Sequence, residues 1–453
     1  MNTTPASTRR LRTLAPGAPG HRSPGLRALA MAAVAIGAGA LPAAAQDPPA
    51  PPPREGTPPA SGGPAKADDQ SLLEGLVAKA IPKVEAARGM KFKSAIPVAP
   101  VTREQFVDRY MKDFERIMGG EDRVAPASRL LGRIGVLAEG TDIRAVLGKF
   151  LEGNIAANYD PQTGRVTFLP GAARSLQTMV HELTHAMDDQ QFDMKAQMAT
   201  WKGQFDRMLA YGALCEGDAE SIEFRFMTNG AIANQPIQGL RDFADAMATA
   251  VLQGKFGATP PAIVLAFKSQ YLEGAIFAET LRRGEAKEEA VNAAFRRPPD
   301  STEQVLHPEK YIAGEGPVEV ALPAAPEGAK VLLATTLGEL NARIVLLTHG
   351  LKKEEAAAAA AGWGGDTIAL VQSGGGEALV WVSFWDTEKD ATEFAEAMNR
   401  AFPVKTGEES AKSSRLLVQR GTKVEYVEAP LDALPDGVAM AKGAEIGKGA
   451  EKK

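Results

Sequence analysis

The sequence of 453 residues contains one cysteine, Cys215, and only five histidines. With a single cysteine the chain can form no internal disulfide bond, so packing or a bound metal must stabilise the fold. Cys215 lies in an apolar stretch with helical spacing, which favours a buried structural thiol over a reactive one. Basic and acidic residues nearly balance, 51 against 56, and the net charge of −5 argues against nucleic acid as a partner.

The first 45 residues resemble a secretory signal peptide. A leader rich in arginine precedes the apolar run ALAMAAVAIGAGALPAAAQ. Ala43, Ala44 and Ala45 fit the small-residue cleavage pattern, so we expect cleavage before Gln46 and a bacterial protein that is secreted or periplasmic. The alternative is an uncleaved anchor, although the run is short for a spanning helix. We expect no transmembrane segment after signal removal, and the lack of a cysteine after the run argues against a lipid anchor.

Composition and periodicity divide the rest of the chain and predict an α+β fold. Residues 46–69 are rich in proline, glycine and alanine, which predicts a disordered linker. Residues 70–325 repeat apolar side chains every three to four positions, which predicts a mainly helical domain. Residues 326–435 combine helical patterns with hairpin-like runs, which predicts a small α+β domain with an antiparallel sheet. Residues 436–453 are typical of a flexible tail.

A short β segment precedes the most informative stretch of the sequence. Residues 156–170, AANYDPQTGRVTFLP, combine two turn signals with an alternating run, which predicts a short hairpin or an edge strand. An edge strand can hold an extended substrate through backbone hydrogen bonds. We therefore predict that Val166, Thr167 and Phe168 form a substrate-holding edge.

The stretch TMVHELTHAMDDQ, residues 178–190, contains two of the five histidines within a predicted helix over residues 173–192. Positions four apart lie about 40° from the same helix face, so His181 and His185 can present ring nitrogens to one metal ion. Glu182 lies about 100° around the helix, from where it can reach a water on that metal. These are the geometric demands of a hydrolytic zinc site.

A catalytic tetrahedral zinc needs a third protein ligand and one open position. His307 and His349 are candidates, as are the acidic residues of a second predicted helix over residues 203–228. Glu216 flanks the apolar stripe of this helix, where a carboxylate is unfavourable unless it is paired or binds a metal, so we favour it. The neighbouring Gly217 indicates the close approach of another element.

Acidic residues around this set have predicted supporting roles. Glu220, one turn after Glu216, can accept the outer N–H of a ligand histidine. Asp188 and Asp189 either orient a ligand or cap their helix, and the sequence leaves both roles open. Glu223 is predicted to lie on a solvated helix face.

A peptidase also needs a donor to the developing oxyanion. The candidates are His307, Tyr159, Tyr211 and Tyr271. We favour His307, since a His-Pro in a long loop could fold over the site, and a structural histidine in a turn is the alternative. Elsewhere, GWGGD at residues 362–366 predicts a tight turn with a packed tryptophan.

These motifs resemble a known class of enzymes. HExxH with a downstream EGxA glutamate is similar to the gluzincin zinc metallopeptidases, although thermolysin-like members have aspartate where this chain has Glu220. Over most of the chain beyond about residue 85, the motifs HELTHAMDDQQFD, ALCEGDAE, PPDSTEQVLHPEKY, GWGGD and WDTEKDATEFA resemble a group of secreted bacterial metallopeptidases. The resemblance implies a zincin-like helical domain that binds one Zn2+ through the two motif histidines and Glu216. It further implies that Glu182 is the general base and that the substrate is a peptide or protein.

Two other functions stay open at this point. A non-catalytic cell-envelope protein would use zinc as a structural staple, and a binding protein would act through its C-terminal α+β domain. The presence of Glu182 argues against a purely structural site, which needs no base. Residues 70–120 could serve as an inhibitory pro-segment, and no feature of the sequence indicates an oligomeric state.

Overall fold

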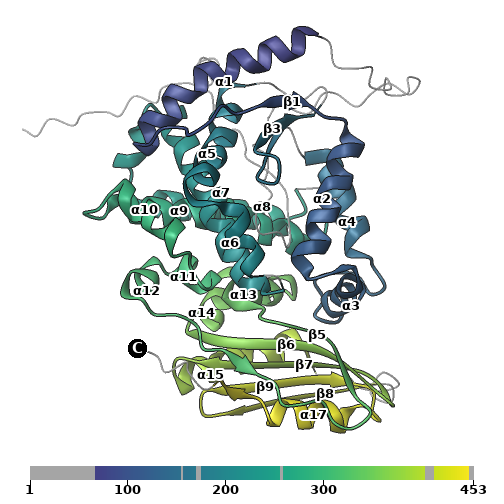
Figure 1. The fold of residues 1–453 in the computed structure, drawn as a ribbon. Coiled ribbons are helices and arrows are strands. Elements are labelled where there is room, and N and C mark those ends of the chain that lie inside the picture. The colour runs from purple at the N-terminus through teal and green to yellow at the C-terminus, as the bar shows by residue number, and fades with distance from the viewer. Residues whose placement is uncertain are drawn as a thin grey trace, which may run out of the picture.

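The computed structural model describes residues 67–154, 157–169, 175–201, 203–255, 259–403 and 413–447. A mainly helical N-terminal part packs against a C-terminal part built around a five-stranded β-sheet, so the fold is α+β as predicted (Figure 1). The predicted signal peptide and nearly all of the predicted linker lie outside the described residues. Within the described ranges, none of the helices combines the length and the apolar character that a membrane span requires.

Three long helices form the centre of the helical part, where α7 packs between α5 and α9. Helix α1 crosses α5 on the side far from the sheet (Figure 1). The helices and helical turns are α1 (Ala67–Arg88), α2 (Arg103–Met118), η1 (Glu121–Arg123), α3 (Val124–Arg133), α4 (Ile143–Asn154), α5 (Leu176–Phe192), α6 (Met194–Thr200), α7 (Phe205–Met227), η2 (Ala231–Asn234), α8 (Ile237–Leu252), α9 (Pro261–Arg283), α10 (Glu288–Arg296), α11 (Thr302–Leu306) and α12 (Pro308–Ala313).

Local sequence signals set the ends of the helices that matter for the site. Helix α5 begins after Ser175, whose hydroxyl accepts a hydrogen bond from the Thr178 N–H, and it ends at Asp193 in the left-handed region, with φ 53°. Thr102 and Gln105 form a capping box at the start of α2. The predicted helix over residues 203–228 corresponds closely to α7.

A small sheet lies beside α5 and contains β1 (Val98–Pro100), β2 (Ala157–Asp160) and β3 (Arg165–Phe168). Strands β2 and β3 form the predicted hairpin, but β3 also pairs in parallel with β1, so the strand order is β1-β3-β2. The prediction that Val166, Thr167 and Phe168 form an edge is therefore wrong. The alternation of apolar and polar residues indicates that one face of a strand is buried, but it does not indicate how many strands pair with it.

The C-terminal part is a five-stranded antiparallel sheet in the order β5-β6-β7-β9-β8, as the sequence predicted in outline. Alternate residues of β7 face opposite sides, so Trp381 packs against Phe394 of α15 while Val380 packs in the cluster that contains Met440 of α17. The elements are β4 (Val320–Ala321), β5 (Lys330–Thr335), α13 (Gly338–Thr348), α14 (Lys353–Ala360), β6 (Trp363–Ser373), β7 (Gly376–Trp385), α15 (Glu388–Ala401), β8 (Ser414–Arg420), β9 (Lys423–Ala429), α17 (Leu434–Lys442) and β10 (Glu445–Ile446).

Two expectations for this region need correction. The predicted tail from residue 436 begins too early, since most of α17 falls in it and β10 pairs with β4. Its glycine- and alanine-rich composition obscured the buried Met440 and Ala441. Trp363 and Asp366 lie in β6 rather than in a tight turn, and the Asp366 carboxylate accepts hydrogen bonds from the Leu337 N–H and the Trp381 indole.

Candidate metal centre

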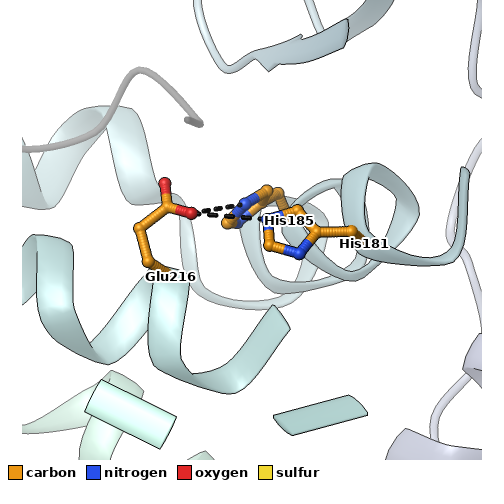
Figure 2. Close-up of side chains that lie close together, drawn as sticks. All are labelled: His181, His185 and Glu216. Carbon is orange, nitrogen blue, oxygen red and sulfur yellow. Dashed lines mark hydrogen bonds and ion pairs between the residues drawn. The ribbon is translucent and has the colours of Figure 1, made fainter. Parts of the chain in front are cut away.

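Helices α5 and α7 bring three of the predicted side chains together. The Oε2 atom of Glu216 lies 3.4 Å from Nε2 of His181 and 3.4 Å from Nε2 of His185 (Figure 2). Both histidines are fully buried, and Glu216 is 2% exposed. The one-turn spacing in α5 and the carboxylate on the inner face of α7 therefore place three metal-binding atoms at one point.

The spacing of these atoms fits a tetrahedral zinc ion. Bonds of about 2.0–2.1 Å at tetrahedral angles place ligand atoms about 3.3 Å apart, whereas a direct hydrogen bond brings N and O to about 2.7–3.2 Å. The observed 3.4 Å matches the first arrangement. In addition, Nε2 of His185 is buried without a hydrogen-bond partner among the described residues. The donor set is thus one that zinc prefers.

The electrostatics of the centre favour a cation. Burial alone would raise the pKa of Glu216, but the adjacent His185 and His181 outweigh it and lower this pKa to about 2. Burial disfavours a charged His181, yet Glu216 and Glu223 together raise its pKa well above the usual value. Positive charge between the buried carboxylates is therefore favourable, and a divalent metal would supply it.

Glu182 is buried next to the candidate metal-binding residues and is held by the small sheet. Its Oε2 atom accepts a hydrogen bond of 2.7 Å from the backbone N–H of Tyr159 in β2. Burial raises the pKa of Glu182 to about 7, against the opposing effect of the two motif histidines. The carboxylate is thereby positioned by the backbone and favours proton uptake, as a general base requires.

The partner of the outer ring nitrogen of His181 is Glu223, not the predicted Glu220. The Nδ1 atom of His181 lies 2.9 Å from Oε2 of Glu223, and Gln177 donates to the other oxygen of that carboxylate. Glu223 is fully buried, so its assignment to a solvated face is wrong. Seven residues after Glu216, it lies only about 20° from the same face of α7, a signal that was available in the sequence.

Glu220 is buried near the same ring, and neither of its oxygens has a hydrogen-bond partner among the described residues. Burial and the neighbouring Glu223 raise its pKa well above the usual value. His181, Glu220 and Glu223 could in principle hold a second metal. The 2.9 Å contact between His181 and Glu223 is instead a hydrogen-bond distance, so Glu223 orients the His181 ring.

Glu303, Glu315 and Asp386 form a further cluster of possible metal-binding carboxylates, but a lysine side chain lies between them. Nζ of Lys310 lies 2.5, 3.1 and 2.7 Å from one oxygen of each carboxylate in turn. The ammonium group therefore supplies the positive charge that a metal would otherwise supply.

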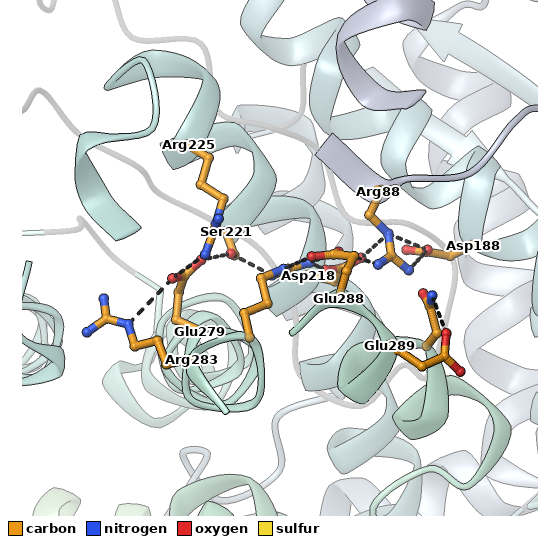
Figure 3. A network of polar contacts seen from close by, with 11 residues as sticks. Arg88, Asp188, Asp218, Ser221, Arg225, Glu279, Arg283, Glu288 and Glu289 are labelled. Atoms are coloured by element: carbon orange, nitrogen blue, oxygen red, sulfur yellow. Dashed lines mark hydrogen bonds and ion pairs between the residues drawn. The ribbon is translucent and has the colours of Figure 1, made fainter. Parts of the chain in front are cut away.

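The two aspartates after the motif have structural roles. Asp188 pairs with the buried Arg88 at 2.8 Å, within a network that continues through Asp218, Arg282 and Glu288 (Figure 3). The network joins α1, α5, α7, α9 and α10, and none of these ion pairs involves His181 or His185.

Asp189 accepts hydrogen bonds from the Tyr159 hydroxyl at 2.7 Å and from the Met194 N–H at 3.0 Å. It thus ties the end of α5 to β2 and to the start of α6. Of the two roles that the sequence left open for these aspartates, capping describes Asp189, while Asp188 pairs with Arg88.

Among the nominated oxyanion donors, Tyr271 is the one that lies at the centre. Its ring stacks on His181 with centroids 6.0 Å apart, and its hydroxyl lies beside Glu216, whose charge adds to burial in raising the Tyr271 pKa. His307 is instead held by Glu339 of α13 at 2.9 Å, a contact that favours the alternative of a structural histidine. The Tyr211 hydroxyl lies beside Cys215, which is buried and free as expected.

The close contact between α7 and α9 explains how Tyr271 reaches the centre. A Cβ atom added to Gly217 would overlap the backbone of Gly274, and one added to Gly274 would overlap Ala213. The two helices can pack at this distance only because both positions are glycine. The predicted close approach at Gly217 is confirmed.

Comparison with known proteins gives little about function. Residues 330–438 match a family model described as a domain of unknown function, DUF8575, which covers the C-terminal sheet and not the metal centre. No curated protein matches the sequence. The chain is similar to a solved structure from Chloroflexus aurantiacus, described as a "putative hydrolase with a novel fold". The identity is 16%, the match covers 55% of this chain and 90% of that chain, and the TM-score is 0.36. A likeness of this strength decides neither the fold nor the reaction.

Proposed function

We propose that this protein is a zinc-dependent peptidase of the gluzincin type that acts outside the cytoplasm. The observation that carries the proposal is the convergence of three donors, with Glu216 Oε2 3.4 Å from Nε2 of both His181 and His185 and Glu182 fixed beside them. The three donors would hold one zinc ion. The signal-like first 45 residues support the extracytoplasmic location.

Each residue of the centre has a role in peptide hydrolysis. The chemistry that a zinc ion supplies at such a site is Lewis acidity, which lowers the pKa of water and polarises a peptide carbonyl. Glu182 takes the proton of the attacking water and returns it to the leaving nitrogen. The Tyr271 hydroxyl donates a hydrogen bond to the developing oxyanion, and Glu223 keeps the His181 ring in the orientation and tautomer that bind metal.

Strand β2 is the better candidate for holding the substrate. It is an edge strand of the small sheet, and its Tyr159 N–H already points to Glu182 and away from β3. An extended peptide along this edge would place a scissile bond next to the general base. The substrate class is therefore an extended peptide or a locally unfolded protein segment.

The test is zinc content and peptide cleavage in the full chain. Purified wild-type protein should bind one zinc per chain and cleave casein or a quenched fluorescent peptide library. Glu182→Gln should keep zinc and lose cleavage by about a hundredfold or more, whereas the exposed Glu396→Gln is the matched control and should change neither. Glu216→Ala should lose the zinc. Zinc absent from the wild type, or cleavage unchanged in Glu182→Gln, would refute the proposal.

The complete burial of the centre favours one alternative, a zinc ion that only stabilises an envelope or binding protein. In that case zinc would bind and raise the unfolding temperature, while neither the wild type nor Glu182→Gln would cleave any peptide. Cleavage that depends on Glu182 separates the two functions.

A further inference from the structure

An apolar pocket lies where the helical part meets the C-terminal sheet. Helices α2, α3 and α4 and strand β5 contribute to its wall, and none of the candidate metal-binding residues lines it. Its volume is about 40 Å³. That is more than the roughly 10–15 Å³ that one water molecule requires and well below the roughly 150 Å³ of a cavity that takes benzene. The pocket can therefore accept a short aliphatic group.

The buried wall of the pocket is apolar, whereas its half-buried rim contains a cation. Six side chains that are each at most 5% exposed form the buried wall: Phe114, Ala127, Leu130, Ile143, Leu333 and Leu337. The other lining residues are half-buried, and Arg123 is one of them. None of the lining residues is acidic. The pocket thus combines an apolar interior with one positive charge at its rim.

One hydrogen bond and two glycines determine where the Arg123 guanidinium lies. Its Nη2 atom donates to the Ala334 carbonyl at 2.9 Å. A Cβ atom added to Gly203 would lie 2.7 Å from Nη1, and one added to Gly119 would lie 3.1 Å from it. Both glycines have positive φ, 78° and 92°, which other residues rarely adopt. The guanidinium therefore occupies space that glycine leaves open, and the bond to Ala334 fixes its orientation.

The charge of Arg123 is not balanced by a carboxylate within the described part of the chain, where its hydrogen bond goes to a backbone carbonyl. Two other arginines, on α3 and α4, do have such partners: Arg129 pairs with Glu377 at 2.8 Å, and Arg144 pairs with Glu115 at 3.1 Å. A guanidinium presents several donors in a planar fork that matches a carboxylate. The rim of the pocket therefore has the charge and the donors that a carboxylate ligand requires.

We propose that this pocket binds a short aliphatic carboxylate, with its tail among the buried apolar side chains and its charge on the Arg123 guanidinium. Burial of the tail is favourable because water in an apolar pocket lacks hydrogen-bond partners. The carboxylate supplies the negative charge that the protein does not place beside Arg123. The bound ligand contacts both α3 and β5, so it stabilises the junction of the two parts of the chain. The site requires no zinc and is independent of the proposed peptidase function.

Calorimetric titration of the full chain tests the class of ligand. Pentanoate is the probe, while acetate keeps the charge without the tail and 1-pentanol keeps the tail without the charge. Pentanoate should bind about tenfold or more tightly than either. Absence of pentanoate binding, or equal binding of acetate or pentanol, overturns the proposal. N-acetylleucine that binds about tenfold more tightly than pentanoate would assign the pocket to the C-terminus of a peptide and overturn it as well.

Two matched pairs of variants test the location of the site. Arg123→Met should weaken pentanoate binding by about tenfold or more, whereas Arg103→Met, at an exposed position, should leave it unchanged. Ala127→Leu should fill the pocket and abolish binding, whereas Ala125→Leu places the same side chain at an exposed position of α3. The unfolding midpoint shows whether each variant keeps the fold. If Ala127→Leu does not fold, Arg123→Met decides alone, and unchanged pentanoate binding in that variant refutes the proposal.

Discussion

Replacing Glu223 should weaken zinc binding more than replacing Glu220, although both are buried glutamates near His181 on α7. The Glu223 carboxylate lies 2.9 Å from the His181 Nδ1 atom, so it orients the ring and makes the metal-binding nitrogen more basic. Glu220 lies near the same ring, but its pKa is raised well above the usual value. A protonated Glu220 is neutral, and glutamine matches its shape and charge.

The expected magnitude follows from loss of this hydrogen-bonded charge. Removing an outer partner of a ligand histidine lowers metal affinity by about 10- to 100-fold, or about 1.4–2.7 kcal/mol. We expect this loss for Glu223→Ala and the lower end of the range for Glu223→Gln, since the amide oxygen still accepts the hydrogen bond. Glu220→Gln should stay within about threefold of the wild type.

Competition with a chromophoric chelator at fixed pH gives the zinc dissociation constant of each variant. Circular dichroism and the unfolding midpoint show whether each variant keeps the fold. If Glu220→Gln loses more affinity than Glu223→Gln, the assigned roles of the two residues are reversed and the reasoning from ring geometry is wrong. Equal small losses would show that neither carboxylate orients a zinc ligand.

Three further predictions concern the frame around the centre, and urea unfolding measures each. Gly217→Ala should destabilise the fold by about 3 kcal/mol or more because α7 and α9 must separate, whereas Gly239→Ala, with open space around it, should stabilise by about 0.5–1 kcal/mol. Arg88→Met should lower the free energy of unfolding by about 3–5 kcal/mol, since it leaves two buried aspartates without one of their cations; a loss below 1 kcal/mol would contradict this. Burial raises the pKa of Glu303 from 4.5 to about 7, so the folded chain holds this proton more tightly than the unfolded chain. This group should therefore reduce wild-type stability as pH rises from about 4.5 to 7, by on the order of 3 kcal/mol, and Glu303→Gln should remove that slope.

The parts of the centre that could be predicted from the sequence are those set by helix geometry. His181 and His185 are one turn apart, and Glu216 is a carboxylate beside an apolar stripe, so local spacing and the energy of burial were enough to select all three. The fold class and the C-terminal antiparallel sheet also followed from periodicity. The bounds of helices α5 and α7 were predicted closely because their periodic segments are long.

The parts that were missed depend on contacts between distant segments. The edge assignment of β3 failed because β1 pairs with it from far upstream. The hydrogen bond from Arg109 of α2 to Asn158 of β2 also joins segments that are far apart in the sequence. Glu223 differs from these, because its two-turn spacing from Glu216 was visible and was set aside in favour of the nearer Glu220.

The number of donors at the centre bears on whether zinc would serve as a staple or as a catalyst. Structural zinc sites are usually closed by four protein ligands, whereas catalytic sites keep three and leave one position open. Within the described part of the chain, three donors form this group and Glu182 does not join them. The Tyr159 N–H instead holds the Glu182 carboxylate at 2.7 Å. A purely structural zinc site would be more stable with a fourth protein ligand. The hydrogen bond from the Tyr159 N–H keeps the adjacent Glu182 carboxylate out of that position, which favours a site whose fourth coordination position is available to water and substrate.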